Sequence, residues 1–203
     1  MSVERETTTR TRDRATDVAA VKIQTDRLLL RRFRHADLDA FVTYRSDEGV
    51  ARFQSWDDSY SMAEAERFLA DDSDVVPGQP GRWLQIAIEE RGTGKLCGDC
   101  AVRVTTEPPR TAELGVTLAP HHQNHGIASE AVRATLDWLF GEQDMHRVYA
   151  QTDDRNKSAQ RLLERLGFRL EARLIEGDWF DGEWTTLRIY AVLKKEWLEL
   201  REL

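Results

Sequence analysis

The sequence predicts a mixed α/β domain whose sheet is mostly antiparallel but contains one parallel pair of strands. Three alternating segments follow one another between residues 82 and 118 with short turns between them, which favours consecutive antiparallel strands. A helix-length amphipathic segment then precedes a β-rich segment at 147–152, the order expected of a right-handed crossover between parallel strands. The 203 residues suit one domain with a sizeable core.

The elements before residue 118 have recognisable starts and turns. Residues 25–31 predict a strand and residues 36–44 a short helix. Ser61 and Glu64 have the spacing of a capping box and predict the start of a second helix. The segment Arg91-Gly92-Thr93-Gly94 predicts the hairpin turn between strands at 82–89 and 96–104.

The elements after residue 140 complete the predicted sheet. The strand at 147–152 precedes an amphipathic helix that Asn156 begins and Gly167 closes. Strands are expected at 168–175 and 184–193, with turns around residues 177–178 and 181–182.

Composition and charge limit the classes of function. Hydrophobic residues make up 40% and charged residues 32% of the chain, which is ordinary for a soluble globular protein. The net charge of −7 disfavours a nucleic-acid partner and favours cationic small molecules or basic peptides. No apolar run is long enough to span a membrane. Residues 1–21 lack the apolar stretch of a secretory signal and predict a flexible tail before a single domain at 22–203.

The two cysteines form a C-x-x-C motif at Cys97 and Cys100, which raises redox or zinc chemistry as alternatives. The motif lies within a predicted strand, where residues three apart point to opposite faces. We therefore expect two structural cysteines, unpaired as in a reducing cytoplasm, and a cytoplasmic protein.

The segment Thr111 to Phe140 carries most of the functional information. Its strand at 111–118 ends at Pro120, and a polar loop leads into a helix that starts at Gly126. The first turn of a helix has backbone N–H groups without intrahelical partners, so it is a potential anion site. Gly126 and Ala128 leave that backbone uncovered, so a pyrophosphate could approach.

The motif Gln123-x-x-Gly126-x-Ala128 between a strand and a helix resembles the acetyl-coenzyme A signature of the GNAT superfamily of N-acetyltransferases. The opening Thr25-x-Arg27-Leu28, the segment from Asn156 to Phe168 and the closing Gly182-Glu183-Trp184 match in the same order. The resemblance is to the branch that modifies ribosomal-protein N-termini, with relatives acting on small amines. It implies the GNAT fold, with helices on both faces of a twisted sheet and a parallel strand pair at the cofactor cleft.

The resemblance also implies the cosubstrate site. Acetyl-CoA would be the acetyl donor, with its pyrophosphate on the backbone amides of Asn124, His125, Gly126, Ile127, Ala128 and Ser129. Backbone groups of Thr117 and Leu118 would pair with the pantetheine arm. Asn156 would face the thiol end of the cofactor; the alternative is that it only caps its helix.

Acetyl transfer to an amine requires a base, a stabilised oxyanion and an acid for the leaving thiolate. Glu113, on the strand before the motif, is the candidate base; the alternative is a solvated or ion-paired glutamate, and Asp99 is the reserve. A backbone N–H near Thr117 would hold the oxyanion. Relatives often have a tyrosine at the position of Leu163 or a serine at that of Ala159, so Ser158, one residue early, is the candidate acid.

The acceptor is a primary amine, at a protein N-terminus or on a small molecule. Trp56 and Trp179 are candidates for the walls of its pocket, with a purely structural role as the alternative. His121, His122 and His125 lie in a loop without a completing carboxylate, so no metal is expected. The missing tyrosine or serine leaves a non-catalytic acyl-CoA-binding regulatory module as the alternative function. A homodimer is expected by analogy only.

Overall fold

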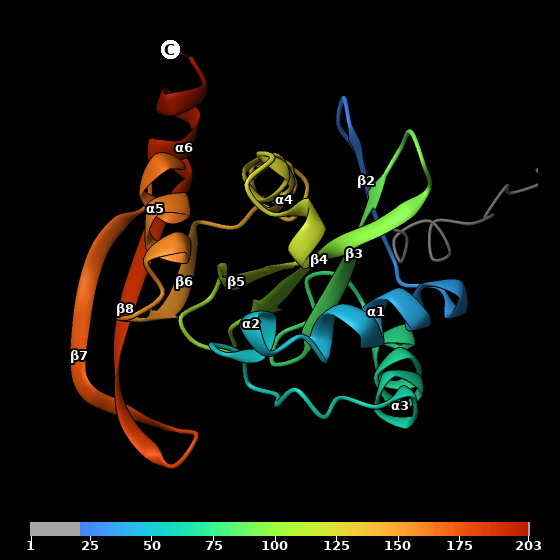
Figure 1. Cartoon of the computed structure of the whole chain (residues 1–203). Coiled ribbons are helices and arrows are strands. Elements are labelled where there is room, and N and C mark those ends of the chain that lie inside the picture. The colour runs from blue at the N-terminus through green and yellow to red at the C-terminus, as the bar shows by residue number, and fades with distance from the viewer. Residues whose placement is uncertain (1–20, 203) are drawn as a thin grey trace, which may run out of the picture.

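The computed structural model describes residues 21–202, so the predicted tail at residues 1–20 lies outside the described part of the chain. Val21, which was assigned to that tail, is buried against the sheet. The eight strands form one sheet in the order β1-β2-β3-β4-β5-β6-β8-β7, as Figure 1 shows. Their bounds are β1 Lys22–Gln24, β2 Leu28–Arg31, β3 Trp83–Glu90, β4 Lys95–Val104, β5 Thr111–Leu118, β6 Arg147–Asp153, β7 Arg169–Phe180 and β8 Glu183–Leu193.

Strand pairing places a gap in the middle of the sheet. Strands β1 to β5 pair antiparallel in chain order, and β6, β8 and β7 form a second antiparallel group. Within residues 21–202, the two groups are joined only by the parallel pair of β5 and β6, which is three residues long: Thr111–Glu113 beside Arg147–Tyr149. Beyond Glu113 the strands diverge, and the edge of β5 has no strand partner.

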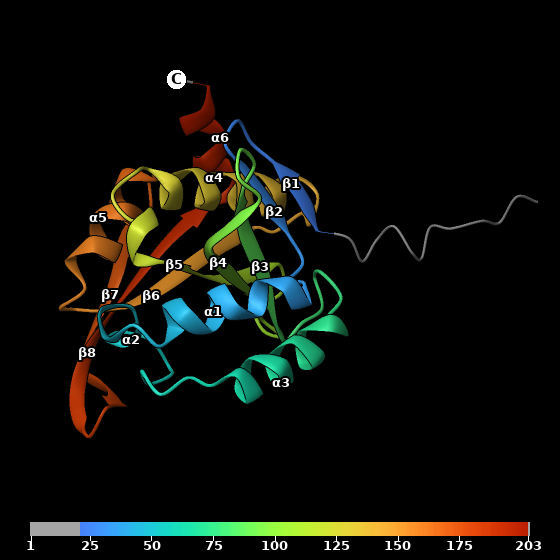
Figure 2. The same ribbon diagram turned by 45° about the vertical axis from the view of Figure 1, so that its right-hand side comes forward.

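Helices cover both faces of the sheet, which confirms the predicted fold class (Figures 1 and 2). Their bounds are α1 Leu38–Arg45, α2 Glu48–Ala51, α3 Met62–Ser73, α4 Ile127–Gly141, α5 Lys157–Arg165 and α6 Lys194–Arg201, with short 3-10 helices at His35–Asp37 and Pro120–His122. The apolar faces of α4, α5 and α6 pack in one core cluster with side chains from β2 to β6 and β8. The opposite face holds a smaller cluster, in which α1 and α3 supply the aromatic side chains Phe41, Tyr44 and Phe68.

Local sequence signals set most of these boundaries. The capping box is confirmed, since the Ser61 N–H donates to Glu64 Oε2 at 2.7 Å and the Glu64 N–H donates to Ser61 Oγ at 3.3 Å. Of residues 25–31, only Leu28–Arg31 form a strand, β2. Residues 25–27 form the turn that joins it to β1, where the Thr25 N–H donates to the Leu28 carbonyl at 2.9 Å. Helices α2 and α6 have no strong periodicity and were not expected. Strand β7 continues through the predicted turn at residues 177–178 as far as Phe180.

The prediction that Cys97 and Cys100 point to opposite faces is wrong, because β4 contains a bulge. Gly98 pairs with Ile88 but Leu96 pairs with Glu89, so Cys97 is an extra residue in its strand. Both side chains therefore join the same core cluster, and both thiols are free. Burial raises the pKa of Cys97 to about 11 and that of Cys100 to about 12, so neither is a reactive thiolate near neutral pH.

No helix within residues 21–202 is long and apolar enough to cross a bilayer.

Candidate active site

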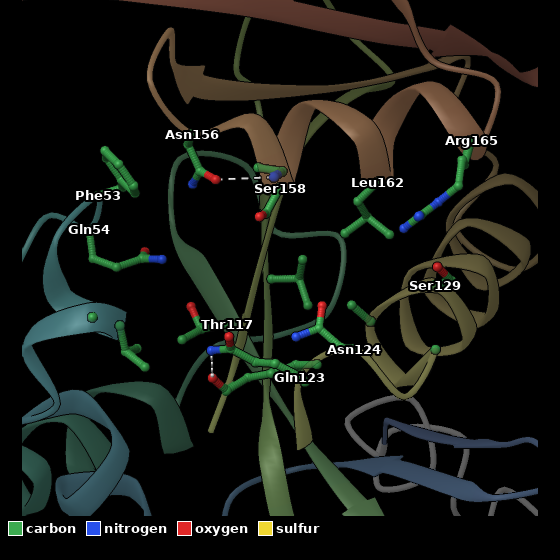
Figure 3. A pocket seen from close by; sticks show the side chains of 17 residues that line it. Phe53, Gln54, Thr117, Gln123, Asn124, Ser129, Asn156, Ser158, Leu162 and Arg165 are labelled. Carbon is green, nitrogen blue, oxygen red and sulfur yellow. Dashed lines mark hydrogen bonds between the residues drawn. The ribbon is translucent and has the colours of Figure 1, made fainter. Parts of the chain in front are cut away.

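A cavity of about 350 Å³ opens where β5 and β6 diverge. Its walls come from four parts of the chain: the α2 region, the end of β5, the start of α4 and helix α5. Figure 3 shows Arg165 and Leu162 reaching from α5 toward Ser129, while Phe53 and Gln54 lie at the other end of the cavity, near Asn156. The lining residues are Gly49, Val50, Phe53, Gln54, Val116, Thr117, Leu118, Gln123, Asn124, Gly126, Ala128, Ser129, Asn156, Ser158, Ala159, Leu162 and Arg165.

The backbone of β5 alternates between β4 and the gap. The Thr111 carbonyl accepts from the Thr105 N–H at 2.8 Å, and the Ala119 N–H donates to the Cys97 carbonyl at 2.9 Å, so both face β4. By the two-residue period of a strand, Thr117 also faces β4, whereas Val116 and Leu118 face the gap. The backbone contacts expected of Thr117 therefore shift to Val116, and Thr117 presents its side chain to the cavity.

The turn before α4 fixes the exposed helix start. The Gln123 side chain donates to the Leu118 carbonyl at 3.1 Å and so ties the loop to the end of β5. Asn124 and Gly126 both have positive φ, 62° and 78°, which turns the chain sharply into the helix. No side chain caps the N-terminus of α4. Uncapped amides at a helix start offer hydrogen bonds to an anion in the cavity.

The predicted phosphate-binding residues differ in where their side chains lie. Asn124, Gly126, Ala128 and Ser129 line the cavity. Ile127 is buried in the core beneath α4, and the carbonyl of His125 accepts a hydrogen bond from Arg27 Nη1 at 3.0 Å. Arg27 in turn pairs with Glu130 at 2.6 Å, which braces the helix start against β2.

Helix α5 forms the opposite wall of the cavity. Asn156 caps this helix, because its Oδ1 accepts a hydrogen bond from the Ala159 N–H at 3.1 Å. Asn156 also lines the cavity, so the helix-capping role and the predicted place beside the cofactor are compatible. Ser158 and Ala159 follow on the same wall, and Figure 3 shows Ser158 facing the cavity. Arg165, two turns further on, is the one charged side chain among the cavity-lining residues of the described chain.

Glu113 lies on β5 outside the lining of this cavity, on the sheet face opposite to α4. Its carboxylate pairs with Arg103 on β4 and accepts hydrogen bonds from Tyr149 Oη and Gln151 Nε2, each at 3.1 Å. An ionised carboxylate has about four acceptor sites, so these three donors leave one free. Val116 is three residues along β5, about 10 Å away. A base at this position would reach the acceptor amine through water.

Asp99, the reserve base, is enclosed in the core. It is 2% exposed and accepts a hydrogen bond from Tyr44 Oη. Burial raises the pKa of Asp99 and, with the nearby carboxylate, raises that of Tyr44 well above its usual value. Asp99 on β4 is the direct cross-strand neighbour of Thr117 on β5, but it does not line the cavity. It therefore stabilises the packing of α1 on β4 and is not available to an acceptor.

The two predicted tryptophans do not line the cavity. Trp56 stacks on the guanidinium of the buried Arg45, with Cζ 3.8 Å from its ring centroid. Trp179 is at the end of the β7–β8 hairpin, where it packs edge-on against Trp184 with centroids 5.2 Å apart. The structure therefore does not place either tryptophan in the wall of this cavity, where the sequence predicted an acceptor pocket.

Phe53, Gln54 and Arg165 are among the cavity residues that the sequence did not identify. Phe53 and Gln54 follow α2, whose four residues have no readable period, so nothing marked them as a wall. Arg165 lies in the segment from Asn156 to Phe168 that carries the family resemblance, but the sequence suggested no role for Arg165 itself. Helical spacing could have identified Arg165, because positions 158, 162 and 165 fall on one face of the helix, the face that includes the candidate acid Ser158. Residues 21–202 contain no cluster of three His, Cys, Asp or Glu side chains that could hold a metal ion.

Comparison with known proteins agrees with this geometry. The sequence model of the acetyltransferase (GNAT) domain matches residues 27–169, and the chain belongs to this family. It is 27% identical over 172 residues to the uncharacterized N-acetyltransferase YoaA of Bacillus subtilis, covering 85% of this chain and 96% of that one. The protein is an acetyltransferase, and a non-catalytic module has no support in these relatives.

Two further comparisons, one of sequence and one of structure, extend this result. The putative ribosomal N-acetyltransferase YdaF of Bacillus subtilis is 30% identical over 104 residues, 51% of this chain and 57% of that one. The structure of spermidine N-acetyltransferase from Vibrio cholerae in complex with CoA and spermine shares the fold, with a TM-score of 0.75 and 21% identity. That comparison covers 86% of this chain and 99% of the other.

Proposed function

We propose that the protein transfers the acetyl group of acetyl-CoA to a primary amine, at a protein N-terminus or on a small molecule, by direct attack through a tetrahedral intermediate. One observation carries the proposal: a single cavity joins an uncapped helix start, an unpaired strand edge and a set of neutral polar side chains. Each of these three parts matches one part of the reaction.

The residues present fit acetyl-CoA. The pyrophosphate would lie at the start of α4, where the amides of residues 124–129 and the helix dipole favour an anion. Arg165 faces this end of the cavity from α5 and would add a charge-assisted hydrogen bond to a phosphate. The pantetheine arm carries amide groups, and the Val116 backbone and the Leu118 N–H, which face the gap, would bind them as a neighbouring strand does.

The other end of the cavity would hold the reacting groups. The Val116 N–H would stabilise the oxyanion, an effect worth about 3 kcal/mol in comparable acyl transfers. The amine would add to the thioester carbonyl, forming the C–N bond and the tetrahedral intermediate, and its proton would pass through water to Glu113. Collapse of the intermediate would then break the C–S bond and release the thiolate of CoA. Ser158 would relay a proton from water to the departing thiolate, receiving one proton as it donates another. Because a free thiol has a pKa near 8.5, water alone is an adequate substitute.

The reaction is tested by incubating the full chain with acetyl-CoA and a panel of amines and N-terminal peptides while thiol release is measured. Acetylated product must form in equal amount to free CoA. Binding of CoA without thiol release from acetyl-CoA in the presence of any acceptor would refute the proposal.

A further inference from the structure

The acceptor end of the cavity contains no group that would bind a second positive charge. Among the described residues that line the cavity there is no Asp or Glu. Its polar side chains at this end are neutral: Gln54, Thr117, Asn156 and Ser158. Such groups match peptide amides and hydroxyls, whereas an additional ammonium group requires a carboxylate or a free aromatic face.

The carboxylates next to Asn156 are already paired with arginines. Arg155 donates to both oxygens of Asp153, at 2.9 Å from Nε and 2.8 Å from Nη2, and its Nη1 donates to Glu183. These hydrogen bonds lower the pKa of Asp153, so it stays ionised but paired. Asp154, the next residue, is shared between Arg188 and Arg173.

Guanidinium groups also flank the aromatic wall. The Phe53 ring lines the cavity, and the Cζ atoms of Arg52 and Arg155 lie 5.4 Å and 6.0 Å from its centroid. The two arginines occupy positions from which a ring attracts cations. An acceptor with several ammonium groups would meet like charge there and would lose hydration without compensation.

We infer that this transferase selects amines whose neighbouring groups are neutral, as at a peptide N-terminus, and discriminates against polyamines. The inference rests on the proposed acetyl transfer and specifies its acceptor. It opposes the expectation from net charge alone, because the acidic side chains near this cavity are neutralised by specific partners. Gln54 and Arg155 are the residues that set the preference.

The discrimination is tested with three acceptors: a tetrapeptide amide of neutral residues, the same peptide with lysine at its second and third positions, and spermidine. In 0.15 M salt, we expect kcat/KM for the neutral peptide to exceed the other two by at least about tenfold. Equal or greater kcat/KM for spermidine would overturn the inference and leave the proposed acetyl transfer intact. If CoA binds but acetyl-CoA releases no thiol with any of the three acceptors, the proposed function fails, and the inference fails with it.

Two variants test the physical cause. Gln54→Glu places a carboxylate on the wall, and Arg155→Gln leaves Asp153 and Glu183 without their partner. Each should shift the spermidine-to-peptide ratio of kcat/KM upward by about fivefold or more, and added salt should reduce the shift. Arg173→Gln is the matched control, because Arg188 still pairs with Asp154. An unchanged ratio in both variants would contradict the inference.

A third variant addresses the exposed Glu48, which neighbours Gly49 in the wall. Glu48→Gln should leave the ratio unchanged. A selective loss of spermidine acetylation in this variant would show that Glu48 serves as a cation site and would overturn the inference.

Discussion

Replacement of Gly126 tests the phosphate cradle most directly. Gly126 precedes α4 with φ of +78°, and a Cβ placed there would meet only Arg27 Nη2, at 3.5 Å. A side chain therefore fits the space but strains the backbone by about 1–2 kcal/mol. Gly126→Glu adds a carboxylate beside the helix start, whereas Gly126→Gln adds the same bulk and strain without charge.

The difference between the two variants isolates the electrostatic effect. At 4 Å and an effective dielectric of 20, two unit charges of like sign repel by about 4 kcal/mol. Arg27, which already pairs with Glu130, would screen part of this repulsion. We expect Gly126→Glu to bind CoA at least about 100-fold more weakly than Gly126→Gln, that is by about 2.7 kcal/mol or more.

Isothermal titration with CoA in 0.15 M salt measures both affinities, and circular dichroism melts check that both variants fold. The backbone strain should lower the melting temperature of both by a similar amount. Equal affinity of two folded variants would refute the placement of the diphosphate at this helix start.

Three further predictions concern charged side chains around the site. Arg165→Gln should raise the Kd for CoA about tenfold and weaken its salt dependence in titration, whereas Arg161→Gln, on the same helix but outside the cavity, should not. Glu113→Gln should lower kcat and change its pH profile with CoA affinity nearly unchanged; an unaltered profile would remove Glu113 from the base role. Hydrogen bonds from Arg173 and Arg188 lower the pKa of Asp154 to about 2, below its unfolded value of 3.8. Its stabilising contribution is therefore present above about pH 4 and lost as the pH falls toward 2, so urea unfolding of Asp154→Asn should depend less on pH over this interval than that of the native protein.

Elements with a strong period or a local cap were predictable because their signals are local. Strand β5, helix α4 and the capping box at Ser61 each follow from neighbouring residues alone. The four-residue helix α2 was missed because so short a segment has no period to read. The bulge at Cys97 also escaped prediction, since it depends on the register between β3 and β4.

The candidate site divides in the same way. The turn at Gly126 and the cap at Asn156 are short-range features, and the sequence located both. Which backbone groups of β5 face the gap depends on its pairing with β4, and this changed the residue expected to hold the oxyanion from Thr117 to Val116. An ion pair was one alternative for Glu113, but its partners come from β4 and β6 and could not be named from the chain order.

The sequence by itself predicted the family and the fold class, and it located the segment that we propose binds the cosubstrate, because each depends on motifs and periods that span few residues. The tertiary structure decided which charges are paired near the end of the cavity where we propose the acceptor binds. The net charge of −7 pointed to cationic acceptors, but the carboxylates near Asn156 are paired with Arg155 in the turn before α5, Arg173 on β7 and Arg188 on β8. Electrostatic recognition depends on which charges remain unpaired at short range, and only the folded chain sets those distances.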